Sequence, residues 1–210
     1  MPARIKFADE SDAAAIAKIY RPIVESTTIS FETVPPDREE MARRIVATTC
    51  EHPWLVCDIG GRVAGYAYAT KHRVRSAYKW SVDTSVYVDD GFRLRGVGRG
   101  LYESLFGILA TQGYFNAYAG IALPNAASVG LHEAVGFRKI GVYARVGYKF
   151  DEWRDVGWWQ LELRAHEESP AEPLSIAEAQ ALPEWNALLA RGERSVRAEA
   201  IQIASNRVFK

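Results

Sequence analysis

Apolar residues along this chain recur at two different spacings, which divide residues 4–163 into strands and helices. Alternation with period two predicts strands, whereas apolar residues three or four positions apart predict amphipathic helices. The predicted strands are 4–8, 53–59, 62–69, 80–88, 115–121, 137–144 and 156–163. The predicted helices are 13–26, 37–49, 98–112 and 125–135. Their order predicts an α/β (α+β) fold, with a mixed and mostly antiparallel sheet flanked by helices on both faces.

Glycine and proline mark several boundaries of these elements. Gly60-Gly61 is expected to join two strands as a hairpin, and Gly136 is suited to end the fourth helix. Pro22 lies inside the first helix, and because proline lacks an N–H donor we expect a kink or a split there. Residues 27–34 predict an extended loop between the first two helices.

The pattern changes after residue 164. Residues 165–174 are polar and contain prolines, which is typical of a linker, and residues 175–210 are rich in Ala, Glu and Arg. We therefore predict a domain at 1–164, a linker at 165–174 and a helical C-terminal extension at 175–210. Its predicted helices, 175–190 and 193–205, are too short to be stable alone. The extension is expected to cover the domain or to strengthen a dimer.

Composition restricts the classes of partner. The 210 residues carry 26 Lys and Arg against 26 Asp and Glu, so no overall field attracts nucleic acid or an anionic membrane. No run reaches the ~18 apolar residues of a membrane span, and the N-terminus lacks the apolar core of a signal peptide. Cys50 and Cys57 are expected to be buried thiols, although a bridge between them stays open. These features predict a cytoplasmic protein with no nucleic-acid or membrane partner.

The stretch from Arg93 to Gly100 is the most specific chemical signal. It follows a predicted strand and opens a predicted helix, where unpaired N–H groups and the positive end of the helix dipole favour an anion. Its glycines allow close approach of the backbone, and Arg93, Arg95 and Arg99 add positive charge. Such a turn suits a pyrophosphate, although alone it also fits a tight connection with solvated arginines.

Two motifs together carry a family resemblance. Arg93-x-x-Gly96-x-Gly98 resembles the acetyl-CoA pyrophosphate loop of the GNAT N-acetyltransferase superfamily. Asn125-x-x-Ser128 with Leu131 and Gly136-Phe137 resembles its Asn-x-x-Ser…Leu-x-x-x-x-Gly-Phe cofactor helix. Five further segments are similar to the phosphinothricin acetyltransferase (L-amino acid N-acyltransferase) family: 26–33, 78–80, 85–88, 147–150 and 155–161. The resemblance covers about residues 3–163 and does not include the C-terminal extension.

The resemblance implies an acetyl-CoA-dependent N-acetyltransferase with a GNAT-type fold. Its substrate would be the α-amine of a small amino acid or analogue, of the phosphinothricin, methionine sulfoximine or methionine sulfone type. The acetyl group would pass by direct attack in a ternary complex, and we expect a homodimer. No metal is predicted, because no Cys/His cluster has metal-ligand spacing. Two alternatives stay open: an enzyme for another amine, such as a polyamine or a protein N-terminus, and a non-catalytic acetyl-CoA-binding module.

The resemblance also implies which residues hold the cosubstrate. Backbone groups of a splayed strand would pair with the pantetheine arm, and loop N–H groups would bind the pyrophosphate. One backbone N–H would polarise the thioester, an interaction that can be worth roughly 3–4 kcal/mol. The implied cosubstrate-binding residues are Val86, Tyr87, Val88, Arg93, Leu94, Arg95, Gly96, Val97, Gly98, Asn125 and Ser128.

Asp83 and His132 are the two candidate catalytic residues. Asp83 stands where the phosphinothricin family carries a catalytic glutamate, and its shorter side chain favours contact with the amine through a water. An ordinary strand aspartate, solvated or salt-bridged, is the alternative. His132 stands where many GNAT enzymes carry a tyrosine that protonates the departing thiolate. Its imidazole could accept a proton from the amine or donate one to sulfur.

The resemblance places the substrate among basic and aromatic residues. Arg73, Arg75 and Tyr78 align with residues that grip substrate acid groups, and a guanidinium can hold a carboxylate bidentately. Phe31 would line the pocket. We expect the remaining residues of interest to be structural, with tryptophans packing the sheet and a subunit contact, and histidines on the surface or in the linker. They are Trp153, Trp158, Trp159, His52, His72 and His166.

Overall fold

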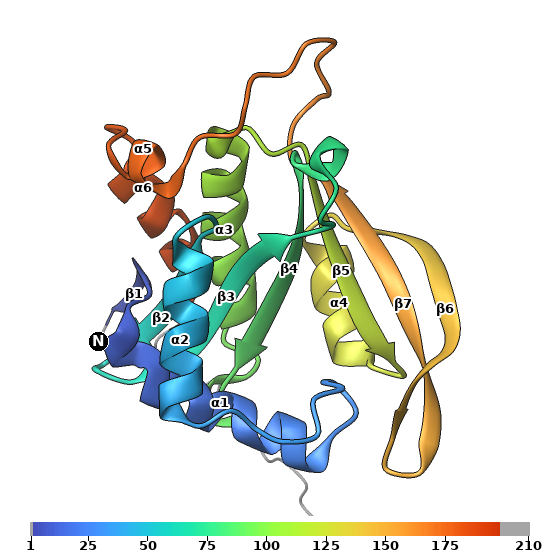
Figure 1. Ribbon diagram of the computed structural model, residues 1–210. Helices are drawn as coiled ribbons and strands as arrows, with labels where there is room; N and C mark the ends of the chain where they lie inside the picture. Colours follow the sequence, from blue (N-terminus) through green and yellow to red (C-terminus); the bar gives the residue numbers. More distant parts are fainter. Residues whose placement is uncertain (1, 198–210) are drawn as a thin grey trace, which may run out of the picture.

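One sheet runs through the molecule with its strands in the order β1-β2-β3-β4-β5-β7-β6 (Figure 1). The computed structural model describes residues 2–197. The strands are β1 (Ala3–Phe7), β2 (Trp54–Ile59), β3 (Val63–Lys71), β4 (Ser81–Val88), β5 (Asn116–Leu123), β6 (Arg138–Lys149) and β7 (Glu152–Glu162). Only β4 and β5 are parallel neighbours in this described sheet. The predicted mixed, mostly antiparallel architecture is confirmed.

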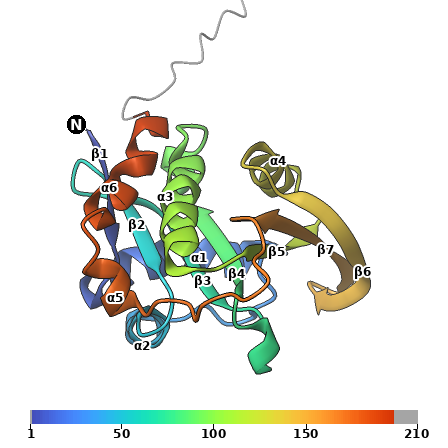
Figure 2. The same ribbon diagram turned by 90° about the horizontal axis from the view of Figure 1, so that it is seen from above.

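Helices cover both faces of this sheet (Figure 2). The first face carries α1 (Ala13–Ser26) and α2 (Arg38–Thr49), and the second carries α3 (Val97–Gln112) and α4 (Ala126–Ala134). Short 3-10 turns lie at η1 (Glu10–Asp12), η2 (Ser76–Tyr78) and η3 (Asp90–Phe92). The Asp37 carboxylate caps α2 by accepting a hydrogen bond from the Glu40 N–H at 2.8 Å. The order of strands and helices is the predicted one, and α1 continues through Pro22 without a split.

Two hydrophobic cores hold these layers together. On the α3 side, Leu101, Leu105 and Ile108 are fully buried against the sheet. On the α1 and α2 side, Ile16 and Ile45 are buried against the other face. Each such side chain stabilises the fold by about 1.5–3 kcal/mol through removal of apolar surface from water. Side chains of a strand point alternately to the two faces, so neighbouring residues of β4 belong to different cores.

The hairpin of β6 and β7 is longer than the sequence pattern predicts. Both strands extend to a two-residue turn at Phe150 and Asp151, whose φ angles are +51° and +58°. Two positive φ angles are typical of a type I′ hairpin turn, which usually contains Asn or Gly. Because Phe-Asp is not that signal, the predicted ends at 144 and 156 are too short. Figure 1 shows this hairpin twisting away at one edge of the sheet.

The C-terminal extension packs on α3 and β1 (Figure 2). It contains α5 (Ile176–Gln180), α6 (Trp185–Ala190) and η4 (Arg191–Ser195), so the predicted helix 175–190 is broken in two. Pro183 lies in the break, where it removes a helix donor. Trp185 packs on Phe7 with ring centroids 5.8 Å apart. Of the predicted helix 193–205 and of the extension to 210, residues 198–210 lie outside the described residues.

Two surface and burial predictions are wrong. His52, expected on the surface, is 7 % exposed and stacks on Tyr114 with ring centroids 5.9 Å apart. Burial lowers the pKa of His52. Cys57 is buried as expected, but Cys50 is exposed, and both are free thiols.

Neither a membrane-spanning helix nor a metal-binding cluster is found in the part of the chain that the structure describes. Within residues 2–197, no helix is both long and apolar enough to cross a membrane. The same residues contain no group of three or more His, Cys, Asp and Glu side chains that could hold a metal ion.

Candidate active site

The site begins where β4 and β5 separate. The two strands pair only from Ser81 with Asn116 to Asp83 with Tyr118, whereas β4 stays paired with β3 as far as Val88. Figure 1 shows the two strands diverging beyond this point. The β5-facing backbone groups of residues 84–88 therefore have no strand partner within the described sheet. We call this gap the β4–β5 opening.

A cavity of about 400 Å³ occupies the wide end of the opening, and we call it the outer cavity. Its walls come from both layers, since Ile23 of α1 and Leu131 of α4 both line it. A cavity with walls from both faces passes between the strands. The sequence-predicted residues that line it are Val86, Tyr87, Val88, Arg93, Leu94, Gly96, Val97, Gly98, Asn125 and Ser128. Among the predicted cosubstrate residues, Arg95 is the one outside this wall.

The N-terminus of α3 forms one end of the outer cavity. Gly96 precedes the helix with φ of +80°, a left-handed conformation that favours glycine. The first helical hydrogen bond runs from Gly100 N–H to Gly96 C=O at 2.8 Å, and no side chain caps the helix among the described residues. The N–H groups of the first turn and the dipole behind them therefore suit an anion.

Backbone crowding shows why glycines stand in this loop. A Cβ added at Gly96 would lie 2.0 Å from the Ser195 carbonyl oxygen, and one at Gly98 would lie 2.9 Å from Leu131 Cδ2. Arg197 N–H also donates to the Arg95 carbonyl at 2.8 Å, so the C-terminal extension braces the back of the loop. The residues present thus fit a diphosphate, held mainly by backbone.

The arginines of the loop are partly occupied by neighbours. Arg93 forms an ion pair with Asp90 at 2.7 Å, and Arg99 forms one with Glu103 at 3.0 Å. The Arg95 guanidinium lies 5.0 Å from the centroid of the Phe92 ring. Exposed pairs of this kind are weak, at about 0–1 kcal/mol, so an incoming phosphate can compete for Arg93.

His132 lies at the narrow end of the opening, in a cavity of about 50 Å³ that we call the inner cavity. Its walls include Thr84, Tyr102 and His132, and it shares Asn125 and Ser128 with the outer cavity. The two cavities therefore adjoin each other. His132 is 4 % exposed.

The hydrogen bonds of His132 fix its tautomer. Nδ1 lies 2.8 Å from the Ser128 carbonyl oxygen, which can only accept, so Nδ1 carries the proton. Nε2 then accepts from the Tyr102 hydroxyl at 2.8 Å. Burial lowers the pKa of His132, although the bond to the Ser128 carbonyl opposes this. Neutral His132 thus faces the cavity together with Tyr102, a residue that no sequence motif indicated.

Asp83 lies at the closed end of the opening and has an unexpected partner. His72, predicted to be a surface residue, lies with Nδ1 2.6 Å from Asp83 Oδ1, and its side chain is 11 % exposed. The prediction of a surface position is therefore wrong. The register of β3 and β4 pairs Thr70 with Asp83, so His72, two residues further along the chain, is a diagonal neighbour of Asp83 on the same face. Burial raises the pKa of the Asp83 carboxyl, and the hydrogen bond and charge of His72 offset this only in part.

Aromatic rings enclose the imidazole of His72. It stacks on Tyr118 at 4.3 Å between centroids and meets Tyr78 edge-on at 6.0 Å. The Arg73 guanidinium lies 5.6 Å from the centroid of Trp158, which also meets His72 edge-on. The structure therefore brings Arg73, Tyr78 and Asp83 together around His72.

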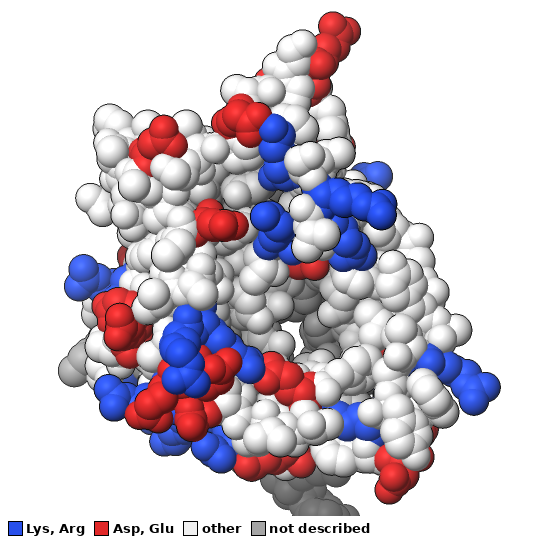
Figure 3. All heavy atoms as spheres, in the orientation of Figure 1, with Lys and Arg blue, Asp and Glu red and all other residues white. Residues whose placement is uncertain are grey.

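Arg75 is exposed at the start of η2, where its carbonyl accepts from Tyr78 N–H at 3.0 Å. Figure 3 shows a group of basic side chains beside a hollow near the centre of this face.

The Trp158 Nε1–H is buried and has no acceptor among residues 2–197, so it is a donor that a ligand can satisfy.

Phe31 lies in the loop between α1 and α2 and is not among the residues that line the two cavities. Its ring lies against Gly147 of β6, where an added Cβ would come within 2.1 Å of Phe31 Cε2. Ile29, two residues earlier, lines both cavities. Lys149 of β6 fixes this loop by donating to the carbonyls of Val24 and Ser30 at 2.7 and 2.8 Å.

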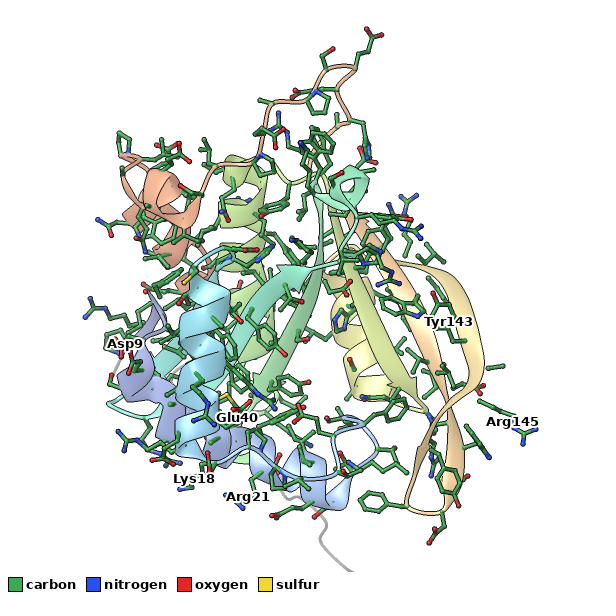
Figure 4. The ribbon with its side chains drawn as sticks, viewed as in Figure 1. Asp9, Lys18, Arg21, Glu40, Tyr143 and Arg145 are labelled. Carbon is green, nitrogen blue, oxygen red and sulfur yellow. The ribbon has the colours of Figure 1, made fainter. Side chains whose placement is uncertain are left out.

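The rest of the β6–β7 hairpin adds to this side of the site. Tyr143 points from β6 toward Trp158, with ring centroids 5.6 Å apart, whereas Arg145 points outward (Figure 4). Trp159 is 2 % exposed within the core, as expected for a sheet-packing residue, and Trp153 packs on Tyr148.

Comparison with known proteins identifies relatives of this chain. Residues 5–158 match the family model described as "Acetyltransferase (GNAT) domain". Phosphinothricin N-acetyltransferase of Streptomyces viridochromogenes is 38 % identical over 175 residues, covering 83 % of this chain and 93 % of the relative. L-methionine sulfoximine/L-methionine sulfone acetyltransferase of Salmonella typhimurium is 34 % identical, with 77 % and 95 % covered.

The fold is likewise similar to solved structures. A crystal structure of a GNAT superfamily phosphinothricin acetyltransferase from Sinorhizobium meliloti, in complex with AcCoA, superposes with a TM-score of 0.76. It is 31 % identical, and the match covers 84 % of this chain and 99 % of that one.

Proposed function

Because the chain belongs to the GNAT acetyltransferase family, we propose that it acetylates the α-amine of a small amino acid or analogue, with acetyl-CoA as the acetyl donor. The observation that carries the proposal is the β4–β5 opening, whose outer cavity is lined by backbone of β4 and by the glycine loop before α3. The names of the relatives, phosphinothricin and methionine sulfoximine or sulfone acetyltransferases, support an amino-acid analogue as the acceptor.

We assign the cosubstrate to the outer cavity. Bound acetyl-CoA supplies a thioester, from which the acetyl group passes to the amine as a C–N bond forms and the C–S bond breaks. The first-turn N–H groups after Gly96 would hold the diphosphate, and the free edge of residues 86–88 would bind the pantetheine arm. Asn125 caps α4 by accepting from Ser128 N–H at 3.1 Å, which leaves its amide N–H₂ to donate to a ligand.

We assign proton delivery at sulfur to Tyr102 and His132. The pair can take up a proton through the Tyr102 hydroxyl, which passes its own proton to His132 Nε2, and can return one by the same path. A sulfur atom needs a proton as the C–S bond breaks, and a relay at the narrow end of the opening can supply it.

We assign recognition of the acceptor's acid group to Arg73, Arg75 and Tyr78, with Phe31 on the opposite side. Guanidinium groups bind carboxylates and phosphinates well and would repel a polyamine, so this basic rim favours an acidic amino acid over a cationic substrate. The non-catalytic module, the other alternative, predicts that acetyl-CoA binds and no acceptor reacts.

The function is tested by incubating the purified protein with acetyl-CoA and either phosphinothricin or methionine sulfone, and following free thiol. We expect thiol release with these acceptors and none with spermidine. Calorimetry with acetyl-CoA alone is the matched measurement, because binding without thiol release from any amino acid would support the non-catalytic module. Release with spermidine alone would favour the polyamine alternative.

We propose a homodimer that covers the outer surface of β6, the edge strand of the sheet. Ile140, Val142 and Val146 are each at least 43 % exposed there, and apolar side chains gathered on an edge strand favour pairing with a second copy. Sedimentation should give twice the monomer mass. Ile140→Asp should halve it, whereas Val74→Asp, at a 91 % exposed position away from the hairpin, should not.

We also propose the cytoplasm as the compartment, since two free cysteines fit a reducing environment.

We propose that residues 1–164 form the catalytic domain and that the extension after the linker 165–174 braces the diphosphate loop. Gly192 and Gly100 meet so closely that a Cβ on Gly192 would lie 1.8 Å from the Gly100 carbonyl oxygen. Gly192→Ala should therefore displace η4 and weaken acetyl-CoA binding in calorimetry. The control is Gly130→Ala in α4, where an added Cβ meets nothing within 4 Å. Equal affinity in both variants would contradict the bracing role.

A further inference from the structure

We propose that His72 and Asp83 act as one base, in which Nε2 of His72 takes the proton of the substrate ammonium and Asp83 orients the imidazole. The proposal rests on the amine-acetylating function proposed above and adds a residue to it. Its basis is a partly buried hydrogen bond between two side chains that the β3–β4 register places at the closed end of the opening.

The hydrogen bond determines which nitrogen is available. Nδ1 lies 2.6 Å from Asp83 Oδ1, short for an N–H···O contact and typical of a charge-assisted bond. An ionised carboxylate only accepts, so Nδ1 carries the proton and Nε2 keeps its lone pair. This is the arrangement by which a carboxylate holds a histidine base in its reactive tautomer in hydrolases.

The surrounding rings hold the imidazole without consuming Nε2. Tyr118 stacks on one face of the ring, while Tyr78 and Trp158 lie at its edges. None of the residues from 2 to 197 forms a hydrogen bond with Nε2. Because the side chain is still 11 % exposed, an amine or one bridging water can reach this nitrogen.

The neighbours of the pair define its charge. Arg73 is a charged group that acts on Asp83, and its positive charge favours the carboxylate form. Tyr78 of η2, Tyr118 of β5 and Trp158 of β7 are the other side chains that face the imidazole. Burial raises the pKa of Asp83. Burial is also the main cause that raises the pKa of Tyr118, and the charge of Asp83 adds to it.

The imidazole also solves the problem of reach. Aspartate is one methylene shorter than glutamate, which at the sequence level favoured a bridging water between Asp83 and the amine. The ring of His72 carries the acceptor atom beyond the carboxylate, toward the side where Arg73 and Tyr78 lie. A substrate whose acid group is held by Arg73 would bring its α-amine to the same place.

The protons balance as follows. The ammonium gives one proton to Nε2, and its nitrogen keeps the electron pair for the new C–N bond. The imidazolium, stabilised by Asp83, then releases this proton to solvent. The nitrogen loses its second proton after the C–N bond has formed, and the sulfur takes one up as the C–S bond breaks. Amide, thiol and one net proton result, with no further reactant.

The kinetic test separates a base from a mere support. His72→Asn keeps an N–H donor near the position of Nδ1 but has no proton acceptor, whereas His72→Phe keeps only the ring. If His72 is the base, both variants lose about 10²-fold in kcat, and the pH profile of kcat/KM loses its lower inflection. If His72 only supports Asp83, His72→Asn keeps kcat and the profile, and the proposal is wrong. His166→Asn, at an exposed linker histidine, is the matched control.

A second readout needs no turnover. Nitrogen-edited NMR of the protein without ligands should show His72 protonated at Nδ1, with a strongly downfield proton that disappears in Asp83→Asn. Acetyl-CoA affinity should be unchanged in every variant, which excludes misfolding. A proton on Nε2 would overturn the proposal. If the wild-type protein releases no thiol with any amine, the proposed function fails instead, and the NMR tautomer decides the pairing separately.

Discussion

Backbone groups form most of one side of the β4–β5 opening, whereas side chains form the other. On the side that we propose for the cosubstrate, one contiguous stretch from Val86 to Gly98 supplies most of the wall, and the groups proposed to bind are backbone N–H and C=O. On the side that we propose for the acceptor, side chains arrive from separate segments. They are Phe31, His72, Arg73, Tyr78, Asp83, Tyr118 and Trp158.

This difference predicts which side of the opening tolerates sequence change. A site built from backbone depends on conformation and on the absence of side chains. The substitutions that disturb it are therefore replacements of glycine. A side-chain site depends on which groups meet, so single replacements can change its chemistry while the fold stays the same. Relatives with one cosubstrate and several acceptors are expected from such a division.

The largest effect is expected on the acceptor side. Asp83→Asn removes the carboxylate that orients His72, and kcat should fall by about 10²–10³ with unchanged acetyl-CoA affinity. Steady-state kinetics and calorimetry measure the two quantities. Asp151→Asn makes the same replacement in the exposed hairpin turn, where φ is +58° and asparagine is tolerated, and should leave kcat unchanged. Loss of cosubstrate binding in Asp83→Asn would show that the two sides are not separate.

A loss of cosubstrate affinity is the next largest effect. Gly96→Ala imposes a side chain at φ of +80° and places its Cβ 2.0 Å from the Ser195 carbonyl. The left-handed conformation alone costs about 1–2 kcal/mol, so the dissociation constant for acetyl-CoA should rise about tenfold or more. Titration calorimetry measures it, and kcat at saturating acetyl-CoA should change little. A variant with unchanged affinity would remove the loop from the binding site.

Removal of the Tyr102 hydroxyl should have a smaller effect. Tyr102→Phe leaves His132 Nε2 without its donor and interrupts the path to sulfur, so kcat should fall roughly tenfold, about 1.4 kcal/mol. Tyr114→Phe is a matched buried control outside both cavities. Equal kcat in the two variants would assign Tyr102 to the core alone.

The smallest effect concerns the loop that carries Phe31. Burial alone would raise the pKa of Glu32, but hydrogen bonds from Arg44 and Tyr20 outweigh it and hold this pKa below its ordinary value. Stability from a lowered pKa is present above the unfolded value of about 4.3 and is lost as the pH falls through the lower folded value. Both side chains are more than a third exposed, so the pair contributes about 0.5–1 kcal/mol.

Urea unfolding of the wild-type protein and Glu32→Gln at pH 7 and pH 3 measures this contribution. At pH 7 the wild-type protein should be more stable than Glu32→Gln, and this difference in the free energy of unfolding should be smaller at pH 3. A difference independent of pH would show that the ion pair is not its source.

The sequence predicted the order of elements and marked most residues that line the outer cavity, because both follow from local patterns. Hydrophobic spacing located β1 to β5 and α1 to α4, and two motifs marked the loop before α3 and the cap at Asn125. The β6–β7 hairpin was underestimated because its turn uses Phe150 and Asp151 in place of the usual residues. The ends of such strands depend on pairing across the hairpin, which local spacing does not report.

The acceptor side was harder to predict because its contacts join distant residues. His72 and Asp83 are 11 positions apart, and Tyr102 and His132 are 30 apart. The first pair could be found from a sheet register, since the β3–β4 hairpin places the two residues together. The second joins two helices whose relative rotation no motif encodes. The sequence predicted His72 to be a surface residue because it lies in a charged loop. Only the tertiary structure shows that aromatic rings enclose it.

Lys149 has a practical consequence for redesign of this enzyme. Its ammonium group, at the tip of β6, grips two carbonyls that belong to α1 and to the loop carrying Phe31. The hairpin and the loop are thereby one mechanical unit. We expect that shortening the hairpin at its turn will shift Phe31, which we propose lines the acceptor site, and will thereby alter acceptor selectivity. Grafts should therefore exchange the lysine, the hairpin and the loop together.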